Sequence, residues 1–129
     1  MEYKAIAQNI KVTPRKARLV ADAVRGLSVA NALSQLNLLH KRAALPLKKV
    51  LDSAVANAVH NGKEGKGDLV IKEIMINEGI SYKRYHFAAR GRIRPYKKRT
   101  SNIRVVVASK KAETKMDKAM TEVKKEETK

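Results

Sequence analysis

The stretch that decides the fold is EGISYKRYHFAARGRIRPYKKRTSNI, residues 78–103. It has almost no helical periodicity, and a glycine, Gly91, lies near its middle. An uncovered loop of this length is uncommon in a compact domain unless it is functional. Folded back as a hairpin over about residues 80–102, each arm would reach roughly 40 Å at ~3.3 Å per residue. That exceeds the ~14 Å radius of gyration expected for a chain of this size. We therefore predict a protruding β-hairpin that needs an external surface to lie on.

The positive charge of the chain is concentrated in the same stretch. The net charge of the 129 residues is +17. Residues 1–79 hold 13 basic and 7 acidic residues, and residues 110–129 hold seven and five. A charge of this size indicates an anionic partner. Residues 80–109 contain no acidic residue and nine basic ones: Lys83, Arg84, Arg90, Arg92, Arg94, Lys97, Lys98, Arg99 and Arg104.

Nucleic acid and anionic membrane are the two partners that such a charge favours. No stretch approaches the roughly 18–20 apolar residues of a membrane span, and the basic segment lacks the helical period of a membrane-surface peptide. The N-terminus has no apolar signal-peptide region. Cysteine is absent, which fits a reducing cytosol. We expect a cytoplasmic protein with no membrane partner.

Four of the five aromatic residues also fall in the basic stretch: Tyr82, Tyr85, Phe87 and Tyr96. Aromatic side chains interleaved with arginine and lysine suit stacking on unpaired bases while the cations hold phosphates. The alternative is that they form cross-strand pairs that only stiffen the hairpin.

The rest of the chain predicts an α+β fold with a three-stranded antiparallel sheet packed against three helices and a long protruding β-hairpin. Strands are expected at 3–12, 69–77 and from 103, with Ile6, Ile10 and Val12 facing inward in the first. Helices are expected after the capping pair Thr13-Pro14, after residue 28 and over 42–61. We expect one domain over 1–109, and a charged tail at 110–129 that is disordered or a frayed helix.

Three cations crowd the first turns of the first helix: Arg15, Lys16 and Arg18. Cations there oppose the helix dipole by a few tenths of a kcal/mol each. A phosphate bound at the helix N-terminus would explain them. A solvated face that tolerates the small penalty would explain them equally well.

Catalytic and metal-binding patterns are absent from the sequence. His40, His60 and His86 share no metal-ligand spacing, and the chain has no thiol and no serine in a nucleophile elbow. Residues 62–65 match the letters of a GxxG loop, but they are expected between a helix and a strand rather than between two helices. We expect no enzyme activity, no cofactor, no metal and no small-molecule substrate.

Several motifs lie in an order and spacing that resemble a known family. Residues 13–20 read TPRKARLV and VRG follows at 24–26, while SAVANA at 53–58 is followed by Asn61. The hairpin carries EG at 78–79, KR at 83–84, GR at 91–92 and KRTS at 98–101. Over about residues 3–108 these motifs resemble the bacterial form of protein twenty-two of the large ribosomal subunit.

The resemblance implies a structural component of the large ribosomal subunit that binds large-subunit rRNA. Its hairpin tip would line the nascent-peptide exit tunnel, and its partners would be the rRNA, neighbouring large-subunit proteins and the nascent polypeptide. Carried over by position, the tip residues are Tyr85, His86, Phe87, Arg90, Gly91, Arg92 and Ile93. The rRNA-binding cations of the arms are Lys83, Arg84, Lys97, Lys98 and Arg99. The residue patterns add Tyr82, Tyr96, Arg15, Lys16 and Arg18 to the rRNA-binding set.

The sequence departs from the family at three places. Phe87-Ala88-Ala89 stands where a Pro-Arg-Ala step is usual, Asn102 stands where histidine is common, and the tail beyond residue 109 is additional. A basic architectural DNA-binding protein is the alternative function. It would share the salt dependence but prefer duplex DNA, and the chain shows no recognition helix.

Overall fold

The computed structural model describes residues 1–109, with the backbone alone at residue 66. The elements are β1 (Glu2–Ile10), α1 (Pro14–Val24), α2 (Val29–Leu38), α3 (Ala44–Gly62), β2 (Leu69–Phe87) and β3 (Ile93–Ser109), with 3-10 turns at Lys66–Asp68 and Ala89–Gly91. The tail predicted at 110–129 lies outside the described residues.

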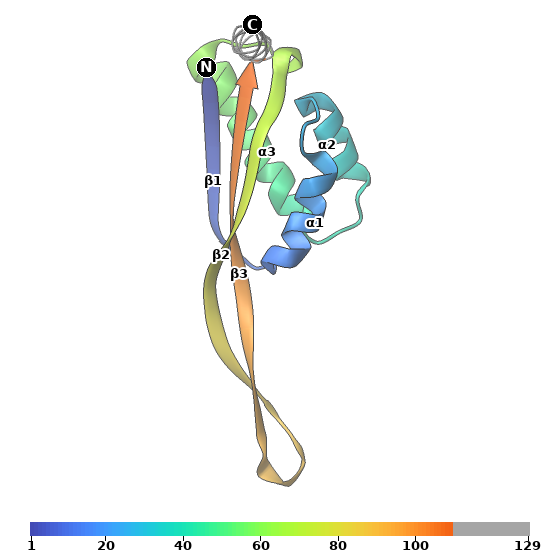
Figure 1. Cartoon of the computed structure of the whole chain (residues 1–129), viewed down its shortest axis with the longest axis vertical. Coiled ribbons are helices and arrows are strands. Elements are labelled where there is room, and N and C mark those ends of the chain that lie inside the picture. The colour runs from blue at the N-terminus through green and yellow to red at the C-terminus, as the bar shows by residue number, and fades with distance from the viewer. Residues whose placement is uncertain (110–129) are drawn as a thin grey trace, which may run out of the picture.

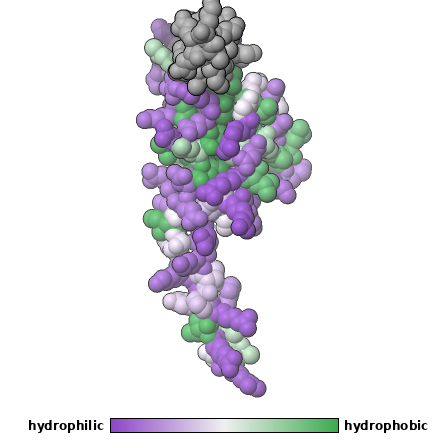
Figure 2. All heavy atoms as spheres, in the orientation of Figure 1, coloured by the Kyte–Doolittle hydropathy of each residue, from purple (hydrophilic) through white to green (hydrophobic). Residues whose placement is uncertain are grey.

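The three strands form one antiparallel sheet in the order β1-β3-β2. The helices lie beside one half of β2 and β3, while the other half of these strands projects as a narrow twisted hairpin away from the N-terminus (Figure 1). Hydrophilic residues cover most of the hairpin, and apolar residues gather mainly in the domain (Figure 2). The predicted α+β class, with three strands, three helices and a protruding hairpin, is confirmed.

The helices begin and end where local sequence signals predict. Thr13 is the N-cap of α1 and Pro14 its first residue, where the missing N–H leaves no bond unmade. Gly26 follows the helix at φ +76°, a conformation that glycine adopts without strain. Pro46 lies in the first turn of α3, so it interrupts no helical hydrogen bond. The buried stripe of α3 forms the centre of the core: Ala44, Leu47, Val50, Leu51, Ala54, Val55 and Ala58.

The expected inward face of β1 was wrong at Ile6, whose side chain is 56% exposed. Tyr3 and Ala5 face the core instead. The register shifts between Ala7 and Ile10, and Asn9 adopts φ +55° within this bulge. A bulge adds one residue to one strand and so exchanges its inward and outward positions. Ile10 and Val12 therefore return to the core although Ile6 does not.

The outer edge of β2 is covered by an arginine of α1 and by the arginine that follows the helix. Arg18 donates from Nε and Nη2 to the carbonyl oxygen of Ile76, at 3.2 and 3.1 Å. Arg25 donates to the carbonyl oxygen of Ile74 at 3.4 Å. An uncovered edge strand presents unpaired backbone groups to other chains, and these bonds satisfy two of them.

Candidate nucleic-acid interface

The root of the hairpin is a bulge at which β2 and β3 leave the domain. The register shifts between Glu78 and Ser81, and the hydroxyl of Thr100 donates to the carbonyl oxygen of Ile80 at 2.7 Å. A Cβ at Gly79 would come within 2.5 Å of that hydroxyl oxygen. Arg99 forms an exposed ion pair with Glu78 at 3.5 Å. This packing fixes the direction in which the two strands continue.

Beyond the root, the hairpin has no core of its own. Every residue from 81 to 99 is exposed except Ala88, which is partly buried. The two strands pair in regular register from Ser81 opposite Arg99 to Phe87 opposite Ile93. Side chains that face each other across two strands point to the same side, so this register sorts the hairpin residues into two faces.

One face combines cations with aromatic rings, and we name it the cation–aromatic face. The rings of His86 and Tyr96 stack with centroids 4.3 Å apart and 14° between their planes. The guanidinium carbon of Arg84 lies 5.7 Å from the centroid of the Tyr82 ring, a cation–π distance. Tyr82 and Tyr96 remain 43% and 40% exposed, so each keeps ring surface for a further contact. The members of this face are Tyr82, Arg84, His86, Arg94, Tyr96 and Lys98.

The stacked pair bears on the two explanations offered for the aromatic residues. Contact between His86 and Tyr96 across the strands supports a stiffening role for Tyr96. The exposed remainder of both tyrosines leaves stacking on unpaired bases open as well.

The opposite face is cationic near the domain and apolar near the tip. Lys83 lies directly opposite Lys97, and like charges in that position repel each other. Farther out, Tyr85 lies opposite Pro95, and Phe87, which is 90% exposed, lies opposite Ile93. The lysine pair therefore favours an anion that contacts both side chains.

The turn at the tip holds two residues in the left-handed region. Arg90 has φ +60° and Gly91 has φ +67°, and the backbone N–H of Ala88 donates to the carbonyl oxygen of Arg92 at 2.8 Å. A non-glycine residue at positive φ is uncommon and carries a small strain. The chain accepts it at Arg90, in the outermost turn of the hairpin.

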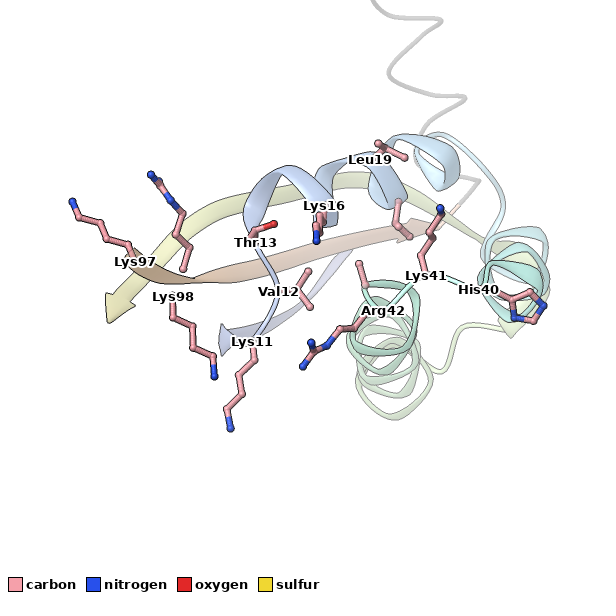
Figure 3. A pocket seen from close by; sticks show the side chains of 13 residues that line it. Lys11, Val12, Thr13, Lys16, Leu19, His40, Lys41, Arg42, Lys97 and Lys98 are labelled. Carbon is pink, nitrogen blue, oxygen red and sulfur yellow. The ribbon is translucent and has the colours of Figure 1, made fainter. Parts of the chain in front are cut away.

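A groove with a volume of about 570 Å³ lies where the hairpin leaves the domain, and we name it the corner groove (Figure 3). It is formed by the segment before and at the start of α1, the connection between α2 and α3, and the β3 segment near the hairpin root. No acidic residue lines it. Seven cationic residues do: Lys11, Lys16, Lys41, Arg42, Lys97, Lys98 and Arg99.

Only some of the predicted site residues line the corner groove. It brings Lys16 together with the hairpin cations Lys97, Lys98 and Arg99. Arg15 is exposed and does not line it, and Arg18 is bonded to β2. Lys83, Arg84 and the tip residues lie farther along the hairpin.

Sequence reasoning missed the remaining groove residues. Lys11 precedes α1, and His40, Lys41 and Arg42 form a short basic run between α2 and α3. The adjacent cations Lys41 and Arg42 were the available signal. That signal is weak, because nothing in the sequence places these two residues near the hairpin root.

The described residues contain neither a metal-ligand cluster nor a helix that could cross a membrane. Within 1–109, no three side chains of the histidine, cysteine, aspartate and glutamate types gather closely enough to hold a metal ion. His40 lines the corner groove, His60 is in the last turn of α3 and His86 is on the hairpin. None of the helices in this part of the chain has the length and apolarity to cross a bilayer.

Comparison with known proteins defines the class. The family model of ribosomal protein L22p/L17e matches residues 5–108. The large ribosomal subunit protein uL22 of Macrococcus caseolyticus (strain JCSC5402) is 44% identical over 124 residues, which cover 96% of this chain and all of that protein. The proteins of the same name from Staphylococcus aureus strains JH9 and Newman are 45% identical over 115 residues, covering 89% of this chain and 98% of each.

These matches place the chain among the ribosomal proteins, which are structural and not enzymes. Within that class, the chain belongs to the ribosomal protein L22p/L17e family, and its relatives at 44–45% identity are uL22 proteins of the large ribosomal subunit. The family resemblance drawn from the sequence motifs is thereby confirmed, and so is the expectation of a structural protein of the cytoplasmic ribosome.

Proposed function

We propose that this protein binds large-subunit rRNA through its hairpin and that the hairpin tip lines the nascent-peptide exit tunnel. The arms hold rRNA phosphates and unpaired bases, with Tyr82 and Tyr96 as stacking platforms. The tip, residues 85–93, contacts the nascent polypeptide. Neighbouring large-subunit proteins are further partners of the assembled protein.

One observation carries the proposal: the exposed hairpin has cations on both faces and no acidic residue between residues 80 and 109. Such an arm has no core to stabilise it, and its like charges repel each other until an anion neutralises them. Phosphates supply that charge, and unpaired bases match the exposed tyrosine rings.

The helix residues of the predicted set contribute to different degrees. Lys16 lines the corner groove and Arg15 is exposed, so both are open to phosphate. Arg18 uses two of the five N–H groups of its guanidinium on Ile76, which leaves three for RNA.

The salt dependence of binding tests the rRNA contact. If the nine basic residues of 80–109 each neutralise a phosphate, log K falls with log salt at a slope of roughly −6 to −8. We expect this slope for the full chain on in vitro transcribed large-subunit rRNA. Replacing three arm cations together, Lys83→Gln, Arg84→Gln and Arg94→Gln, should make the slope shallower by about 2. A slope near −2 for the unmodified protein would overturn the proposal.

Site-specific crosslinking tests the position of the tip. A photoreactive side chain at Phe87 or Arg90, in protein assembled into large subunits, should crosslink to a stalled nascent chain. The matched control carries the same group at Lys63, at the end of α3. Nascent-chain products from the control but not from the tip would refute the tunnel placement and leave the rRNA proposal standing.

The DNA-binding alternative shares the salt dependence and differs in substrate. Membership of a ribosomal protein family favours rRNA. A competition experiment separates the two: duplex DNA of equal length should displace the rRNA only at a large molar excess. Displacement at equal concentration would favour the DNA-binding function.

A further inference from the structure

We propose that the corner groove is a second binding site for the RNA sugar–phosphate backbone, formed by the domain together with the base of the β3 arm and separate from the outer part of the hairpin. This inference rests on the proposed rRNA-binding function and deepens it. It assigns to the domain a specific RNA contact, and the residues that supply it from the domain are Lys11, Lys16, Lys41 and Arg42.

The first argument is electrostatic. Seven cations from three parts of the chain line one groove without an acidic residue. Arg99 is paired with Glu78, and the other six have no ion-pair partner among residues 1–109. Gathering like charges in a concave site raises the local potential and attracts anions. Folding brings these cations together although their mutual repulsion opposes it, which is the arrangement expected for a site that is filled in the assembled state.

The second argument concerns the shape of the ligand. Four apolar residues also line the groove, Val12, Leu19, Val20 and Ala43, and Leu19 is 67% exposed. A small inorganic anion would use only the charges. A ribose–phosphate chain presents phosphates to the cationic side chains and sugar carbons to the apolar ones, so it matches both parts of the lining.

The third argument is the direction of the side chains. In Figure 3 Lys11, Arg42 and Lys98 extend to the same side of the ribbon, from the domain and from the hairpin. A strand of RNA in the groove would therefore contact both at once. Because the hairpin leaves the domain at this corner, such a strand would also hold the hairpin at a fixed direction relative to the domain.

The test compares two triple variants of the full-length protein that lose equal charge. The groove variant is Lys11→Gln, Lys16→Gln and Arg42→Gln, none of which lies on the hairpin. The control variant is Lys4→Gln, Lys49→Gln and Lys63→Gln, all exposed, outside the groove and outside residues 80–109. Circular dichroism and thermal unfolding confirm that both fold. Affinity for transcribed large-subunit rRNA is then measured from 0.05 to about 0.5 M salt, and hydroxyl-radical footprints are taken.

The groove variant should bind about 100-fold more weakly near 0.15 M salt, with a slope shallower by about 2 to 3, because three phosphate contacts are lost. The control should lose less than about 5-fold, since charges more than a Debye length from the RNA are screened. In the footprint, the groove variant should expose a set of nucleotides separate from the set exposed by the Lys83, Arg84 and Arg94 variant.

Each other result has a definite meaning. If the groove variant matches the control while the hairpin variant weakens binding, the groove inference is wrong and the proposed function stands. If neither differs from the control, rRNA binding through the hairpin fails too. If the groove variant keeps its rRNA affinity but enters large subunits poorly, the groove binds an acidic segment of a neighbouring protein instead, and the inference is overturned.

Discussion

Replacing Gly79 with alanine should destabilise the protein at the point where the hairpin leaves the domain. A Cβ there would lie 2.5 Å from the hydroxyl oxygen of Thr100, 3.2 Å from Oδ1 of Asn102 and 3.3 Å from the backbone carbonyl carbon of Thr100. The hydroxyl is not free to turn aside, because it donates to the carbonyl oxygen of Ile80 at 2.7 Å. Either the hydrogen bond breaks or the two strands separate locally.

The expected loss follows from three contributions. A broken hydrogen bond costs about 0.5–1.5 kcal/mol, and overpacking costs about 1–3 kcal/mol. Restricting the unfolded chain at a glycine returns about 0.4–1 kcal/mol. The free energy of unfolding of Gly79→Ala should therefore fall by about 0.5–4 kcal/mol, as measured by urea unfolding of the full-length protein.

Gly67→Ala is the matched control, since a Cβ there would meet nothing within 4 Å. Its stability should stay equal or rise by up to about 1 kcal/mol. Thr100→Ala removes the hydroxyl, so Gly79→Ala should cost clearly less in that background, by a double-mutant cycle. A Gly79→Ala protein as stable as the parent, or a loss unchanged by Thr100→Ala, would refute this account of the root.

Three further predictions concern the domain. Arg18→Ala removes two hydrogen bonds from the edge of β2 and should lower the free energy of unfolding by about 1–3 kcal/mol in urea. Ser101→Ala should leave stability unchanged or raise it by about 1 kcal/mol in thermal unfolding, because the buried hydroxyl oxygen has no hydrogen-bond partner among residues 1–109. The hydrogen bond and charge of Lys72 lower the pKa of Glu2 from its ordinary value. Because the pKa of Glu2 is lowered in the folded state, its ionised side chain contributes stability above the unfolded-state pKa. This contribution is lost as the pH falls through the folded-state pKa. An NMR titration should therefore show Glu2 ionising below the usual range, and Lys72→Gln should return it there.

Controls separate these effects from general ones. Arg15→Ala removes the same charge from α1, and Arg15 makes no side-chain hydrogen bond or ion pair with other residues of 1–109. A loss equal to that of Arg18→Ala would therefore contradict the edge contact. A clear loss of stability in Ser101→Ala would show that the hydroxyl makes a stabilising hydrogen bond, which would contradict the prediction. Because the Glu2 pair is exposed, its pKa shift should shrink at 1 M salt, and a shift independent of salt would exclude the ion pair as its cause.

Much of the fold was predictable because it depends on local sequence patterns. Thr13-Pro14, Gly26 and the apolar stripes set the helices through capping and amphipathic spacing. The hairpin was predictable for the opposite reason. A long stretch with many charges and no helical period cannot join a core, so it has to project. The family motifs were also recognisable, because each is a short run of neighbouring residues.

Other features depended on contacts between distant segments. Ile6 faces outward because the bulge at Asn9 shifts the register of β1, and the backbone N–H of Asn9 donates to Oδ1 of Asn102 at 2.8 Å, across 93 positions. Alternation along β1 alone could not show that shift. Arg18 appeared as one of three basic residues on a helix and proved to be bonded to β2.

The charge of the molecule was thus determined by the sequence, and its distribution in space by the tertiary structure. The net charge indicated an anionic partner, and the order of residues along the chain showed that the hairpin has no acidic residue. The corner groove exists only because packing of α1 and α3 against the sheet brings Lys11 and Arg42 to the root where Lys98 lies. Local signals act over a few residues. A binding surface is assembled when apolar faces far apart in the chain are buried against each other. No local pattern therefore predicts which cations this burial brings together.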